Sequence, residues 1–315
     1  MHRRIAHTTL ALILVALTGL AVVAPYAVSA QAEQVLSIWP VRHEHEAKPG
    51  ETVQGVVNVM NRGSEDRTVY ALAMDFEAGG EGGQPRFIDT PAEGSSHSLA
   101  SWITIVGEPI VIAPGEIVEV PFSISVPQDA EPGGHYAGIL VGRFSPETLE
   151  GEGTAVTVGS VAASLVLLTV PGNIIEEGAI AEFRTSRGFY EHLSVDLYLS
   201  FENTGNVHMK PQGIIEIYDW RNNKKGEVAV NGEGGNVLPN SLRRFEASWS
   251  DGWGFGRYKA VATISYGTEN TELTSEVYFW VIPWKTIIAV VAGLLALGIG
   301  LWQLRKRLRF RVERK

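Results

Sequence analysis

Short runs of apolar residues, broken by turn residues, fill the chain from Gln34 to about residue 281. In residues 118–126, Val-Glu-Val-Pro-Phe-Ser-Ile-Ser-Val, the apolar side chains recur at every second position. This is the period of a β-strand with one face in a core, because successive side chains of a strand point to opposite faces of its sheet. No helical period appears in this region, so the pattern predicts an all-β fold.

The strand-like runs fall into two sets, separated by Pro171-Gly172. Strands are predicted at residues 53–60, 68–76, 102–106, 110–113, 118–126, 135–144 and 155–170, and then at 179–184, 193–201, 213–218, 226–230, 243–249, 257–266 and 271–281. Seven short strands in about a hundred residues, with turn signals between them, are typical of an immunoglobulin-like sandwich. We therefore predict two immunoglobulin-like β-sandwich domains, residues 31–171 and 172–283. The glycine-rich residues 78–83 and 231–236 are expected to form a long flexible loop and a mobile loop.

The N-terminus has the layout of a secretory signal peptide. Arg3 and Arg4 precede an apolar stretch at residues 10–23, which is followed by small residues at 28–30. This order predicts that residues 1–30 are a signal peptide, with cleavage after Ala30 or Ala32. A first membrane anchor is the alternative, but the apolar stretch is short for a span.

A second apolar segment lies at the other end of the chain. Residues 286–304 contain no charged side chain, and Trp284 and Trp302 flank the segment. About 19 helical residues extend roughly 28 Å, close to the thickness of a bilayer's hydrocarbon core. We predict a single transmembrane helix at residues 284–304 and a basic tail at 305–315, which the positive-inside rule places in the cytoplasm. The predicted location is thus the cell membrane, with both sandwich domains outside the cell.

The charge and the lack of cysteine exclude several classes of function. Residues 31–283 hold 16 of the 26 basic residues and 34 of the 35 acidic ones, a formal net charge of −18. Such an acidic body argues against nucleic-acid binding. With no cysteine, the chain forms no disulfide, zinc–thiolate site or iron–sulfur cluster, and its stability depends on the sandwich cores.

No catalytic signature is present. The sequence contains no Gly-x-Ser-x-Gly, no His-Glu-x-x-His and no phosphate-binding loop. No spacing among its many carboxylates identifies a glycosidase pair. His43 and His45 lie on one face of a predicted polar strand, but no third ligand is identifiable, so an exposed strand start is expected rather than a metal site. We predict a protein without enzymatic activity, cofactor or metal.

Aromatic residues are the best candidates for ligand binding, because a flat ring can stack on the apolar face of a sugar. The first candidate is Trp253, whose flanking glycines place it in a loop rather than in a packed strand. Trp102 and Tyr136 are also predicted to bind ligand, although an aromatic residue of a sandwich is more often part of the core.

Several motifs carry a resemblance to a known family. The first domain contains Ser-Trp-Ile at 101–103, Ile-Ala-Pro-Gly-Glu at 112–116, Phe-Ser-Ile-Ser-Val-Pro at 122–127 and Pro-Gly-Gly-His-Tyr-Ala-Gly-Ile at 132–139. The second contains Phe-Glu-Asn-Thr-Gly-Asn-Val-His at 201–208 and Val-Leu-Pro-Asn-Ser-Leu-Arg-Arg at 237–244. This succession resembles the bacterial WxL-interacting cell-surface proteins and covers nearly the whole of residues 31–283.

The resemblance implies a wall-associated protein whose first domain binds peptidoglycan and whose second domain binds a WxL-type surface protein. The function predicted on this basis is that of a membrane-anchored extracellular adaptor for cell-wall glycan and a second surface protein. The alternative is a structural or chaperone-like surface subunit that binds a protein partner by strand-edge pairing, without binding glycan.

Overall fold

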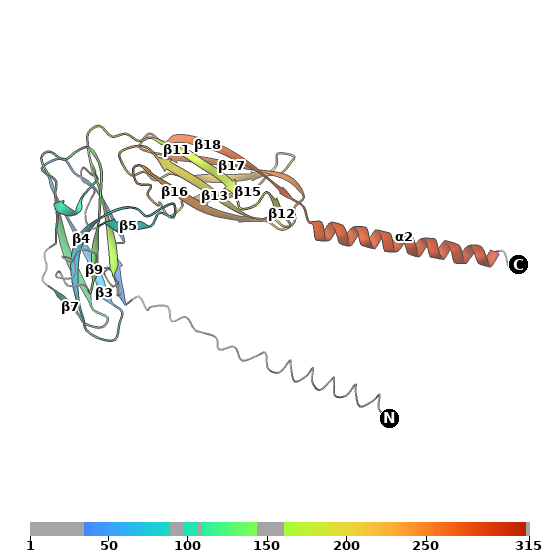
Figure 1. Ribbon diagram of the computed structural model, residues 1–315, viewed down its shortest axis with the longest axis horizontal. Coiled ribbons are helices and arrows are strands. Elements are labelled where there is room, and N and C mark those ends of the chain that lie inside the picture. The colour runs from blue at the N-terminus through green and yellow to red at the C-terminus, as the bar shows by residue number, and fades with distance from the viewer. Residues whose placement is uncertain (1–34, 89–96, 106–108, 144–160, 313–315) are drawn as a thin grey trace, which may run out of the picture. The chain divides into compact units, whose positions relative to one another are not determined.

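The structure is a computed structural model that describes residues 35–88, 97–105, 109–143 and 161–312 (Figure 1). These residues form two β-sandwiches, which we call the first and the second sandwich, and one C-terminal apolar helix, α2. The predicted fold class is confirmed. The predicted signal peptide and its cleavage sites lie outside the described residues.

The first sandwich consists of two sheets. Sheet 1 has the strand order β1-β3-β8-β6, and sheet 2 has the order β2-β10-β9-β4-β5, with β7 also paired to β4. Every pairing is antiparallel except that of β2 with β10. The elements are β1 (Leu36–Trp39), β2 (Arg42–Glu46), β3 (Thr52–Asn61), β4 (Arg67–Ala78), β5 (Pro85–Ile88), the 3₁₀ turn η1 (Ala100–Trp102), β6 (Ile103–Ile105), β7 (Ile110–Ile112), β8 (Ile117–Ser125), β9 (Gly133–Gly142) and β10 (Ala162–Val170).

The glycine-rich residues 78–83 are not a long flexible loop, as predicted, but part of a short connection between β4 and β5. The backbone N–H of Gly79 donates to the carbonyl of Gln84 at 2.8 Å. Gly80 and Gly83 adopt positive φ values of 106° and 71°, which L-residues with a side chain rarely adopt. The glycines therefore permit a tight turn, and β5, which the sequence did not predict, pairs with the end of β4.

The second sandwich also consists of two sheets. Sheet 3 has the order β11-β13-β16, and sheet 4 has the order β12-β18-β17-β14-β15. The strands are β11 (Gly178–Thr185), β12 (Phe189–Tyr190), β13 (Ser194–Asn203), β14 (Gln212–Tyr218), β15 (Lys224–Val230), β16 (Ser241–Ser250), β17 (Gly256–Tyr266) and β18 (Thr271–Val281). All seven predicted strands are present with bounds that agree to within two residues, and the two-residue β12 was not predicted.

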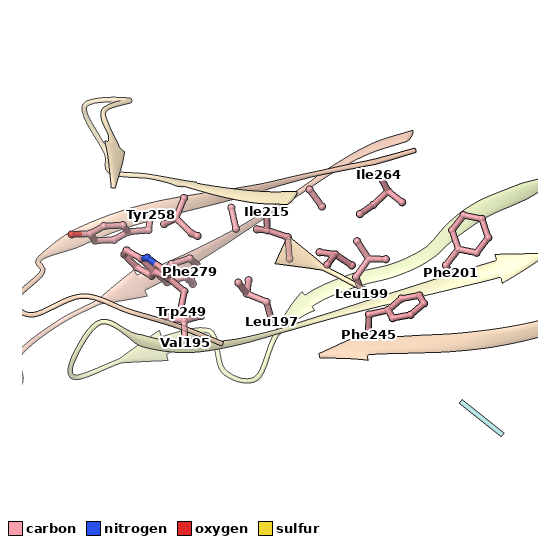
Figure 2. Close-up of a cluster of buried hydrophobic side chains, with 14 of the residues drawn as sticks. Val195, Leu197, Leu199, Phe201, Ile215, Phe245, Trp249, Tyr258, Ile264 and Phe279 are labelled. Carbon is pink, nitrogen blue, oxygen red and sulfur yellow. The ribbon is translucent and has the colours of Figure 1, made fainter. Parts of the chain in front are cut away.

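The cores of the two sandwiches differ in composition. The first is built mainly from buried valine, isoleucine, leucine and alanine side chains, with Phe122 as its buried aromatic residue. The second contains several buried aromatic rings, among them Phe201, Phe245, Trp249 and Phe279 (Figure 2). Both cores arise from the two-residue period, because the inward positions of facing sheets meet in one layer.

A buried asparagine closes the end of β3. Asn61 is inaccessible to solvent, and its Nδ2 donates to the carbonyl oxygens of Glu65 at 2.7 Å and Ile112 at 2.9 Å. Its Oδ1 accepts from the backbone N–H of Gly63 at 2.9 Å. The side chain thus satisfies three backbone groups where the strand turns away from its sheet.

The second sandwich repeats this device at the end of β13. Asn203 is likewise inaccessible, and its Nδ2 donates to the carbonyl oxygens of Val207 at 2.8 Å and Val237 at 2.9 Å. Its Oδ1 accepts from the N–H of Gly205 at 2.9 Å. In both sandwiches the asparagine is followed two positions later by glycine and bonds the carbonyl four positions later, which is a structural repeat that the sequence did not reveal.

A further asparagine organises the predicted mobile loop at 231–236. Asn231 has a φ of 54°, and its Nδ2 donates to the carbonyl oxygens of Pro211 and Gly235, both at 2.8 Å. Its Oδ1 accepts from the N–H of Gly235 at 2.6 Å. The segment is therefore a hydrogen-bonded turn, held by its asparagine, rather than the open loop that its glycines indicated.

The helix α2 extends from Trp284 to Val312. An 18-residue stretch within residues 284–306 has a mean hydropathy of 2.3, and the helix is long and apolar enough to cross a membrane. It continues eight residues past the predicted end at residue 304, through the first part of the predicted tail. No proline or glycine interrupts residues 301–312, so the basic residues extend the helix.

Candidate functional site

The edge of the first sandwich contains a segment that changes sheets. β6 pairs with residues 122–124 of β8 in sheet 1, whereas β7 pairs with residues 67–69 of β4 in sheet 2. β5 pairs with β4 only at residues 75–78. Among the described residues, no strand therefore pairs with residues 70–74 of β4 on the side away from β9, and none with residues 117–121 of β8 on the side away from β3. In the part of the chain that the structure describes, each sheet thus has a short edge with no strand paired to it.

The two open edges differ in how they are protected. Exposed edges usually carry charges or proline, which hinder pairing with another chain. The open part of β8 contains Glu119 and Pro121. The open part of β4 reads Tyr-Ala-Leu-Ala-Met, with no charge, proline or glycine. We call residues 70–74 the open edge of β4.

The side chains of the open edge divide between the core and the outer face of sheet 2. Ala71 and Ala73 pair with Val141 and Ile139, which are fully buried in the core. Tyr70, Leu72 and Met74 therefore point to the opposite, outer face, where all three are partly exposed. The next two strands continue this face with Leu140 and Ala163, which lie in register with Leu72, and with Leu165. The outer face beside the open edge is thus apolar.

At its other end, this apolar face is covered by side chains. Phe76, Tyr136 and Leu167 form a small buried cluster, against which Phe87 of β5 and Leu238 of the second sandwich pack. A Cβ placed on Gly138 would lie only 2.4 Å from the Phe87 ring, so glycine allows this ring to lie against β9. The structure therefore shows that this face already accepts apolar groups from other segments.

The connection between β4 and β5 also contacts the second sandwich. The N–H of Arg244 in β16 donates to the carbonyl of Glu81 at 2.7 Å, and the two side chains form an ion pair. Beside this contact lies a cleft of about 480 Å³. Its lining includes Phe76, His97, Tyr136 and residues 238–242.

Of the three predicted ligand-binding residues, Tyr136 lies at this cleft. Its side chain is only 2% exposed, and its hydroxyl is 3.4 Å from Nδ1 of His208. Burial raises the pKa of the Tyr136 hydroxyl. Its ring also packs against that of Phe76, with centroids 6.0 Å apart, so the residue contributes to the wall of the cleft rather than to an open stacking surface.

The other two predicted residues lie elsewhere. Trp102 in η1 is half-buried, with its ring centroid 4.4 Å from that of His135, whose neighbour Tyr136 points to the opposite face of β9. Trp253 lies between β16 and β17 of the second sandwich and is 72% exposed. The structure does not bring the three aromatic rings together, and the role of each in ligand binding stays a prediction.

The paired histidines of β2 lie on one face of the strand, as predicted, but they are half-buried rather than an exposed strand start. The rings of His43 and His45 stack with centroids 5.8 Å apart, and His43 also contacts Phe122 of the core. Burial lowers the pKa of both imidazoles. In the described ranges, no group of three or more His, Asp or Glu residues is placed to hold a metal ion.

The open edge was not recognised in the sequence, where residues 68–76 were predicted as an ordinary strand. One signal was present: residues 69–74 are apolar at every position, whereas residues 118–126 alternate. A strand with apolar side chains on both faces needs apolar contacts on both. The sequence does not indicate that the outer face beside residues 70–74 is only partly covered.

Comparison with known proteins gives distant similarities in structure. No protein-family model and no curated protein match the sequence. Solved structures with a similar fold include the class 5 fimbriae chaperone CfaA, with 14% identity, a TM-score of 0.36, and coverage of 79% of this chain and 99% of that one. The E. coli chaperone DraB has 12% identity and a TM-score of 0.33, and the match covers 78% of this chain and 97% of that one. The Pseudomonas aeruginosa chaperone CupB2 has 10% identity and a TM-score of 0.33, and the match covers 76% of this chain and 98% of that one. Similarity this low carries no inference about function.

Proposed function

We propose that this chain is a membrane-anchored, non-enzymatic surface protein that binds an extended strand of a protein partner at the open edge of β4. One observation carries the proposal: no strand among the described residues pairs with residues 70–74 on the side away from β9, and this edge has no charge and an apolar outer face. The proposal corresponds to strand-edge pairing, the alternative considered from the sequence, rather than to glycan binding.

The physical basis is the addition of a strand to a sheet. The partner's backbone pairs with the free N–H and C=O groups of β4, and each such hydrogen bond contributes about 0.5–1.5 kcal/mol net. The partner's alternate side chains extend the apolar outer face that Tyr70, Leu72 and Met74 begin. Backbone pairing provides affinity, and the apolar face selects segments with apolar residues at every second position.

The nature of the partner and the place of binding are also proposals. Because residues 31–283 carry a net charge of −18, we infer that basic residues flank the bound segment. A WxL-type surface protein is the partner that the family resemblance implies. We assign α2 as the membrane anchor, with the sandwiches outside the cell and the basic C-terminus inside, on the basis of its apolar residues 284–306.

A crosslinking experiment tests the open edge. A photo-crosslinking residue replaces Leu72 in the full chain within its native membrane, and mass spectrometry identifies the segment of partner that it captures. This segment is synthesised twice, once unmodified and once with alternate backbone amides N-methylated. We expect the unmodified peptide to bind the purified full chain and the N-methylated peptide to bind at least tenfold more weakly, because methylation removes the donors of the new strand.

Matched variants connect binding to the edge. Met74→Lys adds a charge to the outer face at the open edge and is expected to weaken peptide binding at least tenfold. The control is Thr68→Lys, because Thr68 lies on the same face of the same strand where β7 covers the edge. Equal binding by both variants, or unchanged binding of the methylated peptide, would contradict the proposal.

Wall-glycan binding is a second candidate, favoured by the 72% exposure of Trp253. Purified peptidoglycan incubated with the full chain in detergent micelles tests it by co-sedimentation. Retention that is lost in Trp253→Ala and kept in Met74→Lys would support a sugar site separate from the open edge. If the chain does not pellet at low or moderate salt, the glycan candidate is excluded.

A further inference from the structure

Exposed aromatic residues gather at one end of the second sandwich. This end is formed by the loops at 186–193, 219–223 and 251–255 and by the connection from β18 to α2. The exposed aromatic side chains here are Phe189 (66%), Trp220 (61%), Trp253 (72%), Phe255 (53%), Trp280 (44%) and Trp284 (52%). We call these six residues the aromatic end.

The sheet register and local contacts place these residues together. Phe189 pairs with Trp280, and Gly256, which follows Phe255, pairs with Val281 next to Trp280. The N–H of Asp251 donates to the carbonyl of Leu193 at 2.9 Å, which joins the loop of Trp253 to the loop of Phe189. A Cβ placed on Gly256 would lie 3.0 Å from Cδ1 of Trp220, so this ring also lies against the start of β17.

The opposite end of the same sandwich differs. It is formed by the loops at 171–177, 204–211, 231–240 and 267–270. Within the described residues these loops expose no aromatic side chain, and Ile175, at 45%, is their exposed large apolar residue. The exposed aromatic residues are therefore concentrated at one end of the second sandwich and do not occur at both ends.

The aromatic end is also where the chain enters the helix. Only Ile282 and Pro283 separate β18 from α2, so the Cα atoms of Val281 and Trp284 lie at most about 11 Å apart. Two contacts hold this connection against the loop at 186–193. The N–H of Ile282 donates to the carbonyl of Tyr190 at 2.8 Å, and Lys285 forms a 2.9 Å ion pair with Glu191.

The position of α2 in a bilayer then determines the surroundings of these loops. Trp284 and Trp302 are 18 residues apart, about 27 Å along a helix, which matches a hydrocarbon core of roughly 30 Å. Tryptophan favours the boundary between lipid headgroups and acyl chains. If Trp284 lies at this boundary, the short connection holds the aromatic end next to the headgroups.

The aromatic end has no net charge that could attract a charged protein or anionic lipid. The loops and the helix start carry three basic and three acidic side chains, which are Arg187, Arg221, Lys285, Glu191, Asp219 and Asp251. Their formal charges cancel, in contrast to the net charge of −18 of residues 31–283. Burial of apolar and aromatic area, rather than attraction to anionic lipid, is the available source of affinity.

We propose that the aromatic end docks on the membrane that α2 crosses, with Phe189, Trp220, Trp253 and Phe255 inserted among the phospholipid headgroups. The ligand is the interfacial layer of the bilayer itself. Docking would hold the second sandwich on the membrane surface and exclude Trp253 from a role in sugar binding. This inference rests on the proposed membrane crossing of α2 and goes beyond the proposed partner binding at β4.

The lack of cysteine allows a direct test in the full chain. Gly252→Cys and Gly232→Cys place single cysteines at opposite ends of the sandwich, at positions where a Cβ meets no atom within 4 Å. Each variant is labelled with an environment-sensitive fluorophore and reconstituted into vesicles of phosphatidylcholine and phosphatidylglycerol. Resistance to alkaline carbonate extraction, measured first, reports whether α2 crosses the bilayer.

We expect the label at 252 to show blue-shifted emission, quenching by spin-labelled lipid and several-fold weaker quenching by aqueous iodide than the label at 232. The pattern should not change with salt, and Trp253→Ser with Phe255→Ser should remove it, whereas Ile175→Ser should not. Equal iodide quenching at 252 and 232 in carbonate-resistant chains would overturn the docking alone. Release by carbonate would overturn the anchor and the docking together. A change at 252 caused by peptidoglycan fragments rather than by lipid would also overturn the docking, in favour of a sugar site.

Discussion

The two sandwiches share one buried device and differ in what they expose. Asn61 and Asn203 each satisfy two carbonyls and one N–H at the end of a strand, with distances that agree within about 0.1 Å. Around this shared element, the described part of the first sandwich has an apolar strand edge with no strand paired to it, whereas the second sandwich has exposed aromatic residues in its loops. The comparison teaches that the buried asparagine belongs to the shared architecture, while the two sandwiches differ in their edges and loops.

The largest expected effect concerns the aromatic core of the second sandwich. Phe279 is fully buried, with ring centroids 5.6 Å from those of both Tyr190 and Tyr258. We expect Phe279→Ala to lower the free energy of unfolding of this sandwich by about 3–5 kcal/mol, through lost burial and the cavity left behind. Chemical denaturation in detergent micelles, followed by near-UV circular dichroism, measures the change. The control Phe255→Ala removes an exposed ring and should cost less than about 0.5 kcal/mol.

The next prediction tests whether the two asparagines are equivalent. Asn61→Ala and Asn203→Ala each remove three side-chain hydrogen bonds to backbone groups, so each should cost about 2–4 kcal/mol. Calorimetry of each variant reports which transition moves, and Asn58→Ala, which removes a single 3.4 Å bond on β3, is the control. If one variant costs much less than the other, the two devices share geometry but not energetic importance.

A pH dependence is expected from His208, which lies between the sandwiches beside Tyr136. Burial lowers the pKa of His208 from 6.5 to about 4, against the attraction of Glu44 and with repulsion from Lys210 and Arg42. Above pH 6.5 the imidazole is neutral in both states. Between pH 6.5 and about 4 the unfolded chain binds a proton that the folded chain does not, so stability is lost as the pH falls through this window.

The loss attributable to His208 should be about 3–4 kcal/mol, because one unit of pKa corresponds to about 1.4 kcal/mol. Denaturation curves at a series of pH values should show that stability changes less steeply with pH in His208→Gln than in the wild type between pH 6.5 and about 4. Burial also lowers the pKa of His43, His45 and His135, so part of the slope will remain in the His208 variant. An identical slope in His208→Gln would show that this imidazole is not buried in solution.

The smallest expected effect is that of an ion pair between the sandwiches. Nζ of Lys210 lies 2.5 Å from a carboxylate oxygen of Glu44, and both side chains are about one-third exposed. Because partly exposed ion pairs contribute about 0.2–1 kcal/mol, Lys210→Met should change the unfolding free energy by no more than this. Calorimetry at low and high salt checks it, since the difference between wild type and variant should shrink as salt rises. A larger effect would mean that the two sandwiches stabilise each other more than their individual contacts indicate.

Much of the strand content could be predicted from the sequence, because strands such as β8 and β17 show their inward and outward positions by alternation. Short strands were missed, since β1, β5 and β12 have too few residues to show a period. His45 was expected to be exposed, but β2 pairs with β10, more than a hundred residues away, and this pairing determines how far its imidazoles are buried. Trp253 was predicted correctly as a loop residue, because its flanking glycines are a local signal.

By itself the sequence determined the all-β class, the two sets of strands and the apolar C-terminal helix, because the hydrophobic period and an uninterrupted apolar run are local properties. The tertiary structure alone decided that residues 70–74 lie at an open edge, that two distant asparagines make the same bonds, and that aromatic residues of separate loops meet where the chain enters α2. These features depend on strand order and register. Both are set by contacts between residues far apart in the chain, for which a single sequence provides no local signal.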